Sequence, residues 1–119
     1  MAEWLEVGQS GFGNNESTTY VNPATIIKKG SLVTMWVLFD YSNVQTDDVK
    51  PYISVMTLTE FDCIGEQSRR LTYSNHSEKM GHGEITSSHD IETPKWQTIL
   101  PNSVMETVWK YACGKWYTL

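Results

Sequence analysis

The sequence predicts an α+β domain in which a β-sheet supports one short C-terminal helix. The segment LVTMWVLFDY (Leu32–Tyr41) has the composition of a buried strand. Several other segments alternate apolar residues with Thr, Ser and Tyr, as half-buried strands do. The helical pattern near the C-terminus is too short to be stable alone in water. It must therefore pack on something, and the sheet is the available platform.

Length and charge limit the class of protein. A chain of 119 residues, 39% hydrophobic and 19% charged, is typical of one globular domain, so we expect residues 1–119 to form a single domain. The formal net charge of -5 argues against a nucleic-acid partner, because nucleic-acid-binding proteins normally carry a basic excess. The N-terminus MAEWLEVGQ has neither the basic nor the apolar region of a signal peptide. If the protein is exported, we expect its signal peptide to lie outside this sequence.

Six segments are predicted to be strands. In chain order they are Glu3–Val7, Ser17–Asn22, Leu32–Tyr41, Ile53–Cys63, Ser68–Ser77 and Gly83–Asp90. Pro23 is expected to stop the second strand, leaving residues 23–31 as loop or a brief helical turn. The short segment between the fourth and fifth strands suits a hairpin, and residues 93–101 (TPKWQTILP) are expected to be extended.

The helix is predicted from its caps and its apolar stripe. Ser103 and Glu106 form a capping box, in which each side chain accepts the other's backbone N–H. Gly114 lies where a left-handed C-terminal cap is common. The apolar stripe consists of Val104, Met105, Val108, Trp109 and Ala112.

The two cysteines, Cys63 at the end of a strand and Cys113 at the end of the helix, can both point into the helix–sheet interface. A disulfide between them would close a loop of roughly 50 residues and stabilise the fold by about 4 kcal/mol. The alternative is two reduced, buried thiols that pack as small hydrophobic groups. The residues alone leave both interpretations open. A metal site is not expected, because no C-x-x-C pair and no histidine falls at ligand spacing.

Catalytic patterns are not found in the sequence. We expect solvent-exposed side chains rather than metal ligands at His76, His82 and His89. The candidate carboxylates do not form a paired acid and base; they are Asp47, Asp48, Asp62 and Glu66. No nucleophile, phosphate-binding or dinucleotide-binding motif occurs. We therefore predict no enzyme activity, no catalytic residues, no cofactor and no metal.

Candidate binding residues come from two basic doublets, Lys28–Lys29 and Arg69–Arg70. On alternating strands one member of each doublet can reach solvent, where a basic patch would meet an acidic partner. The alternative is ordinary solvated surface. A second surface question concerns Leu32–Tyr41, because apolar residues occupy both of its faces. Either a homodimer or partner protein covers the face that the helix leaves free, or loops and chain ends do.

Several segments, in this order, resemble the bacterial surface-adhesin protein E family. The resemblance covers about residues 17–113. It rests on a Tyr-Val-x-Pro segment, a Val/Trp-rich strand ending in Asp-Tyr, a Glu-x-Asp-Cys strand, an Arg-x-Leu strand, a glycine turn before Glu, and a Trp-Lys-x-Ala-Cys helix. These fall on Tyr20, Val21, Pro23; Val33, Trp36, Val37, Asp40, Tyr41; Glu60, Asp62, Cys63; Arg70, Leu71; Gly81, Gly83, Glu84; and Trp109, Lys110, Ala112, Cys113.

The resemblance implies a six-stranded antiparallel sheet with the C-terminal helix on one face and a Cys63–Cys113 disulfide. It also implies export to the periplasm or outer surface of a Gram-negative bacterium, where thiols stay oxidised, with membrane attachment only through a lipid anchor if the precursor carries one. The implied function is non-enzymatic binding of a protein partner, such as a host extracellular-matrix protein, by a rigid sheet face and loops. The alternatives are a periplasmic or outer-membrane-associated accessory or structural protein, dimeric or not, and a small-ligand carrier or enzyme. The last would require a deep pocket with perturbed ionisable groups.

Overall fold

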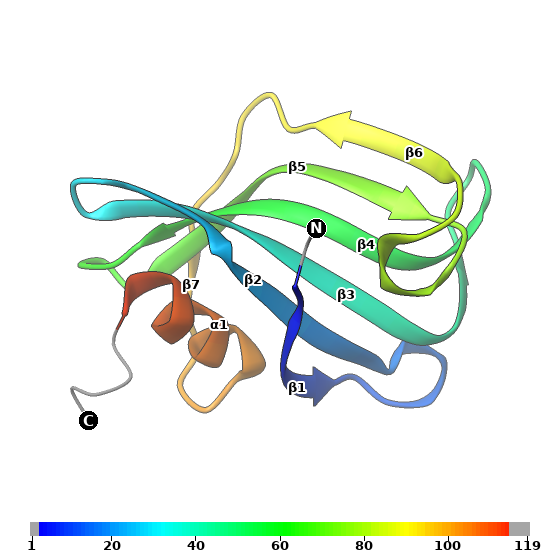
Figure 1. Cartoon of the computed structure of the whole chain (residues 1–119), viewed down its shortest axis with the longest axis horizontal. Coiled ribbons are helices and arrows are strands. Elements are labelled where there is room, and N and C mark those ends of the chain that lie inside the picture. Colours follow the sequence, from blue (N-terminus) through cyan, green and yellow to red (C-terminus); the bar gives the residue numbers. More distant parts are fainter. Residues whose placement is uncertain (1–2, 115–119) are drawn as a thin grey trace.

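The computed structural model describes residues 3–114, which form one antiparallel sheet and one C-terminal α-helix (Figure 1). Six strands follow one another across the sheet in chain order. They are β1 (Leu5–Ser10), β2 (Ser17–Lys29), β3 (Leu32–Thr46), β4 (Pro51–Asp62), β5 (Gln67–His76) and β6 (Ile85–Asp90). A two-residue strand, β7 (Gln97–Thr98), pairs with the start of β5. Two short 3-10 turns, η1 (Gly13–Asn15) and η2 (Lys79–Gly81), precede β2 and β6, and α1 spans Val104–Cys113. The predicted fold class is confirmed.

The predicted end of β2 at Asn22 is wrong, because the strand continues through Pro23 to Lys29. The register with β3 shifts just after Asn22, so Pro23 occupies a bulge, where its missing N–H costs no ladder hydrogen bond. Thr25 bridges the irregularity. Its hydroxyl donates to the Asn22 carbonyl at 2.6 Å and accepts the Trp36 N–H at 3.0 Å.

The other strands are found where they were predicted, with shifted ends. β1 begins later than predicted and extends into the expected loop, β3 continues beyond Tyr41, and β6 begins at Ile85. β4 and β5 form the predicted hairpin, and the turn between them is capped by Asp62, whose carboxylate accepts the N–H groups of Ile64 and Gly65 at 3.1 and 2.8 Å.

The helix caps are confirmed with one difference in detail. The Ser103 hydroxyl accepts the Glu106 N–H at 3.2 Å, as a capping box requires. The Glu106 carboxylate, however, accepts the N–H of Asn102 at 3.0 Å, one residue before the predicted donor. Gly114 ends the helix at φ 66°, in the left-handed region that glycine adopts without strain. No helix within residues 3–114 has the length and apolar character needed to cross a bilayer.

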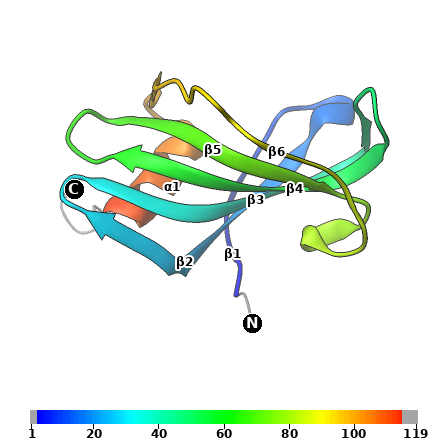
Figure 2. The ribbon, with the colours of Figure 1, turned by 90° about the horizontal axis from the view of Figure 1, so that it is seen from above.

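The core lies between α1 and one face of the sheet, toward the end that carries the β2–β3 and β4–β5 hairpins (Figures 1 and 2). Its buried members are Val21, Val33, Met35, Val37, Phe61, Ile99, Val108, Trp109 and Ala112. The Trp109 indole N–H donates to the Asp62 carbonyl at 3.1 Å. Next to it, Cys63 and Cys113 form a disulfide with their Cα atoms 5.7 Å apart. The pairing implied by the family resemblance is therefore confirmed.

The opposite face of β3 is covered in part by the β5–β6 connection. Residues of this connection hydrogen-bond across the sheet: the Met80 N–H donates to Asp40 Oδ1 at 2.9 Å, and the Gly81 N–H to Ser54 Oγ at 2.9 Å. Leu38 is fully buried, whereas Trp36 is half-buried. A loop of the same chain thus covers part of this apolar face. Homodimer formation stays a prediction.

Candidate binding groove

The helix covers only part of its face of the sheet, and the remainder forms a groove. One hollow, of about 580 Å³, lies between β4, β5, the start of α1 and residues 91–100, which we call the strap. A second hollow, of about 400 Å³, lies over β3, β4 and β5 toward Asp47. Phe39 and Arg70 line both hollows. We therefore treat the two hollows as one groove.

The strap forms a side wall of the groove because it is bonded along β5. The Ile91 N–H donates to the Leu71 carbonyl at 2.9 Å, and the Ile99 N–H donates to the Glu66 carbonyl at 3.0 Å. Between these two bonds, β7 pairs with the start of β5. The extended conformation predicted for residues 93–101 is confirmed where β7 forms.

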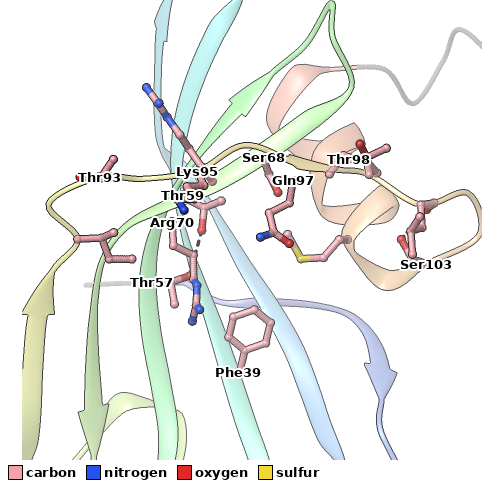
Figure 3. Close-up of a pocket in the computed structure, with 15 residues that line it drawn as sticks. Phe39, Thr57, Thr59, Ser68, Arg70, Thr93, Lys95, Gln97, Thr98 and Ser103 are labelled. Carbon is pink, nitrogen blue, oxygen red and sulfur yellow. Dashed lines mark hydrogen bonds between the residues drawn. The ribbon is translucent and has the colours of Figure 1, made fainter.

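The floor of the groove is made of side chains from adjacent strands. Phe39 is half-buried, whereas Thr57 and Thr59 are almost fully buried. The two threonine hydroxyls lie 3.0 Å apart, as the dashed line in Figure 3 marks, and Thr57 also donates to the Val37 carbonyl at 3.3 Å. These hydroxyls are satisfied internally, so the floor is already ordered before any ligand binds.

A β-bulge directs Arg70 into the groove. Leu58 pairs with Thr72, but Thr59 pairs with Arg70, so Leu71 is an extra residue in β5. Simple alternation would place residues 70 and 73 on opposite faces, whereas the bulge brings Arg70 to the face of Tyr73. The Arg70 guanidinium lies 5.7 Å from the Tyr73 ring centroid. Figure 3 shows its side chain extending beside Thr57 toward Phe39.

The four predicted binding residues have different environments. Arg69 donates to the Glu60 carboxylate at 2.8 Å and lies 4.2 Å from the centre of a Trp96 ring. Arg70 lines the groove and is exposed. Lys28 and Lys29 are exposed at the β2–β3 hairpin and line neither hollow. The binding role of all four residues stays a prediction.

The first hollow is cationic although the chain is acidic. Arg69, Arg70 and Lys95 line it. Arg69 is paired with Glu60, whereas neither Arg70 nor Lys95 forms an ion pair with a carboxylate among residues 3–114. The carboxylate of Asp47, which lines the second hollow, accepts the N–H groups of Val49 and Lys50 and the Asn75 amide at 2.7, 3.0 and 3.0 Å. These hydrogen bonds lower the pKa of Asp47, and the bond from the Val49 N–H contributes most. The charge of Asp47 is thus held in a turn, and Asp47 forms no ion pair with Arg70 or Lys95 within residues 3–114.

The second hollow is aromatic. Tyr41 and Tyr52 contact edge to face with ring centroids 6.3 Å apart, and Tyr73 also lines this hollow. Burial raises the pKa of Tyr52, and the nearby Tyr41 and Asp47 raise it further. Tyr52 is therefore neutral near pH 7 and can donate a hydrogen bond.

One of the three histidines differs from its prediction. His82 and His89 are exposed as expected, but His76 is only 5% exposed. Its Nε2 lies 2.8 Å from the Ser74 hydroxyl, and its Nδ1 is buried with no hydrogen-bond partner among residues 3–114. Burial lowers the pKa of His76, and the nearby His82 lowers it further. Within residues 3–114, no three His, Cys, Asp or Glu side chains are placed to hold a metal ion.

The chemistry of the groove favours binding. Among the described residues that line it, Asp47 is the one carboxylate, and none is His, Cys or Glu. Cations, hydroxyls, amides and aromatic rings remain, and these groups recognise ligands by charge, hydrogen bonding and contact area. The sequence indicated Arg70 as a binding residue but not Phe39, Lys95 or the tyrosines. These residues lie far apart in the sequence, and the strap and the bulge bring them to one groove.

One protein family matches nearly the whole chain. The model of the family described as Surface-adhesin protein E matches residues 4–114. No curated protein gives a match to the chain.

Proposed function

The chain belongs to the surface-adhesin protein E family, and on this basis we propose that it is an exported, non-enzymatic protein that binds a protein partner at a bacterial surface. Its site of action would be the periplasm or the outer surface of a Gram-negative bacterium. A lipid anchor, if the precursor carries one, would supply any membrane attachment.

The open groove beside α1 is the observation that carries this proposal. It crosses a preformed sheet, it is bordered by the strap and the helix, and its Phe39 and tyrosine side chains are of the kinds enriched in protein interfaces. The helix that borders the groove is bonded covalently to the sheet through Cys63 and Cys113. A preformed site loses less conformational entropy on binding than a mobile one.

The disulfide supports export. Disulfides persist in the periplasm and outside the cell, whereas cytosolic reductants remove most of them. The two cysteines of the sequence are both in this bond, so no thiol is left for metal or redox chemistry.

Binding to immobilised, oxidised protein tests the proposal. Purified host extracellular-matrix proteins form one pool, and solubilised envelope proteins of the parent cell form the other. Saturable binding of a matrix protein supports the adhesin role. Saturable binding of an envelope protein alone supports an accessory role in the envelope instead. If neither pool contains a saturable binder, the proposed function is wrong. Fractionation of cells that express the full-length precursor tests the location, and recovery in the cytosol would contradict export.

A small-ligand carrier is a second candidate, favoured by the size of the first hollow. Its volume of about 580 Å³ falls within the range of roughly 300–1,000 Å³ found for small-molecule sites. Native mass spectrometry of the protein purified from its own host distinguishes the two candidates. A carrier should show a bound molecule of constant mass that is lost on unfolding, whereas a protein-binding module should show the mass of the chain alone.

A further inference from the structure

We propose that the groove binds an extended peptide segment of its partner, in which a carboxylate residue lies two positions from an aromatic or aliphatic residue, and that Arg70 pairs with the carboxylate. This inference rests on the proposed function, because it names the chemistry of the partner at the same groove.

The carboxylate is inferred from the charges in the groove. Arg70 contacts the Tyr73 ring but has no carboxylate partner among residues 3–114. Its neighbour Arg69 is already paired with Glu60. A guanidinium presents a planar fork of donors that matches a carboxylate in two parallel hydrogen bonds. Lys95 on the strap adds a second cation to the same hollow, and it too has no carboxylate partner in the described part of the chain.

The net charge of the chain makes this arrangement selective. At -5, the molecule as a whole repels acidic partners, so an anionic segment would be held by the local charges of Arg70 and Lys95 rather than by a general basic surface. Local charge complementarity of this kind contributes more to the specificity of binding and to the position of the ligand in the site than to overall affinity. We therefore expect recognition of one carboxylate at one position rather than of acidic chains in general.

The apolar neighbour is inferred from the side chains around Arg70. Phe39 lies where the two hollows meet. Leu100, which is 65% exposed, lines the first hollow together with Met105 at the start of α1. Tyrosines line the second hollow. Aromatic and apolar contacts next to a desolvated charge pair are where interfaces concentrate their binding energy.

The extended shape is inferred from the way the two hollows are joined. Phe39 and Arg70 line both hollows. A compact ligand would fill one hollow, whereas an extended ligand that contacts these two residues can reach both. An extended segment places every second side chain on the same side, so its side chains can enter the two hollows while its carboxylate meets Arg70 between them.

Selection of displayed random dodecapeptides on the oxidised protein tests this inference. The affinities of selected peptides are then measured by fluorescence anisotropy on the wild type, Arg70→Gln, Arg70→Lys and Lys28→Gln. Lys28→Gln is the matched control, because it removes the same charge at an exposed position that does not line the groove. Circular dichroism and melting curves check that all variants fold, as expected for exposed positions.

We expect the selected peptides to carry Asp or Glu two positions from an aromatic or aliphatic residue, because only such a pair shares one side of an extended segment. Arg70→Gln should weaken their binding by about tenfold or more, Arg70→Lys should weaken it less, and Lys28→Gln should change it by less than about twofold. Replacing the acidic residue of the peptide by its amide should weaken binding to the wild type but add little on Arg70→Gln, because both changes remove the same pair. Absence of selected peptides, peptides without acidic residues, or equal losses for Arg70→Gln and Lys28→Gln would overturn the inference.

The outcomes also separate this inference from the proposed function. If a matrix or envelope protein binds the wild type and Arg70→Gln equally well, the function stands and the assignment of Arg70 fails. If selected peptides depend on Arg70 but neither protein pool contains a binder, the assignment stands and the surface-binding function fails.

Discussion

Removal of the disulfide by the double substitution Cys63→Ala/Cys113→Ala should cost a large part of the stability that a domain of this size possesses. The bond joins residues separated by 50 positions. On the chain-entropy model, closing such a loop lowers the entropy of the unfolded chain by about 14 cal/mol/K, which corresponds to about 4 kcal/mol at 25 °C. Domains of this size are typically stable by roughly 5–15 kcal/mol. The variant should therefore fold, but with a much smaller free energy of unfolding.

The loss arises mainly in the unfolded state. Both cysteines are only half-buried, so their replacement by alanine removes little packing from the core. The indole N–H of Trp109 still donates to Asp62, and the helix caps do not involve the cysteines. The folded variant should therefore keep the aromatic bands in the near-ultraviolet circular dichroism of the wild type and lose only the contribution of the disulfide itself.

Urea unfolding of the oxidised wild type and the double variant measures the effect. We expect a decrease of about 4 kcal/mol in the free energy of unfolding and a steeper dependence on urea, because an unfolded chain without the cross-link exposes more surface. The wild type in excess reductant is the control and should behave like the double variant. A decrease of less than about 1 kcal/mol would refute the reasoning, as would two free thiols in protein purified without reductant.

Three further predictions concern the core, a helix cap and pH. Phe61→Ala should lower the free energy of unfolding by about 3–5 kcal/mol in urea titrations, because Phe61 is fully buried against α1; a loss below about 1 kcal/mol would contradict its place in the core. Ser103→Ala should cost about 1 kcal/mol by removing the acceptor of the Glu106 N–H, while Ser103→Asp, which restores an acceptor, should recover most of the loss. Stability should decrease as the pH falls below about 6.5, because burial lowers the pKa of His76 in the folded protein and the unfolded chain therefore takes up the proton first. Melting curves of the wild type and His76→Gln at about pH 7.5 and about pH 5.5 should show the larger loss for the wild type; equal losses would assign the pH dependence to other groups.

The helix ends and most strands could be predicted from the sequence, because caps and strand composition depend only on residues close together in the chain. The Ser103 cap and Gly114 mark the helix ends in the sequence as they do in the structure, and β3 was recognised from its composition. The predicted end of β2 was wrong because a proline normally ends a central strand. Pro23 is accommodated here by a bulge and by the Thr25 hydroxyl, which accepts the N–H of Trp36 on the next strand. A contact between strands is not visible in the local pattern around the proline.

The groove was less predictable because distant segments build it. Period-two alternation assigns Arg70 and Tyr73 to opposite faces, and only the extra residue Leu71 reverses that assignment. Nothing in the composition of the strap shows that it will follow β5 and bring Lys95 to the same hollow. The basic doublets were visible in the sequence, but the difference between the paired Arg69 and the unpaired Arg70 depends on Glu60 across the hairpin.

The disulfide and the groove are mechanically connected through α1. Cys113 holds the C-terminal end of the helix on the sheet, whereas Ser103 and Met105, at the other end, line the groove. A helix of ten residues is about 15 Å long, and its backbone hydrogen bonds make it a stiff rod over that distance. Fixing one end therefore limits the movement of the wall at the other. A helix this short, held by its apolar face alone, would shift more readily over the sheet, so the bond that constrains the unfolded chain also limits the movement of the groove wall in the folded one.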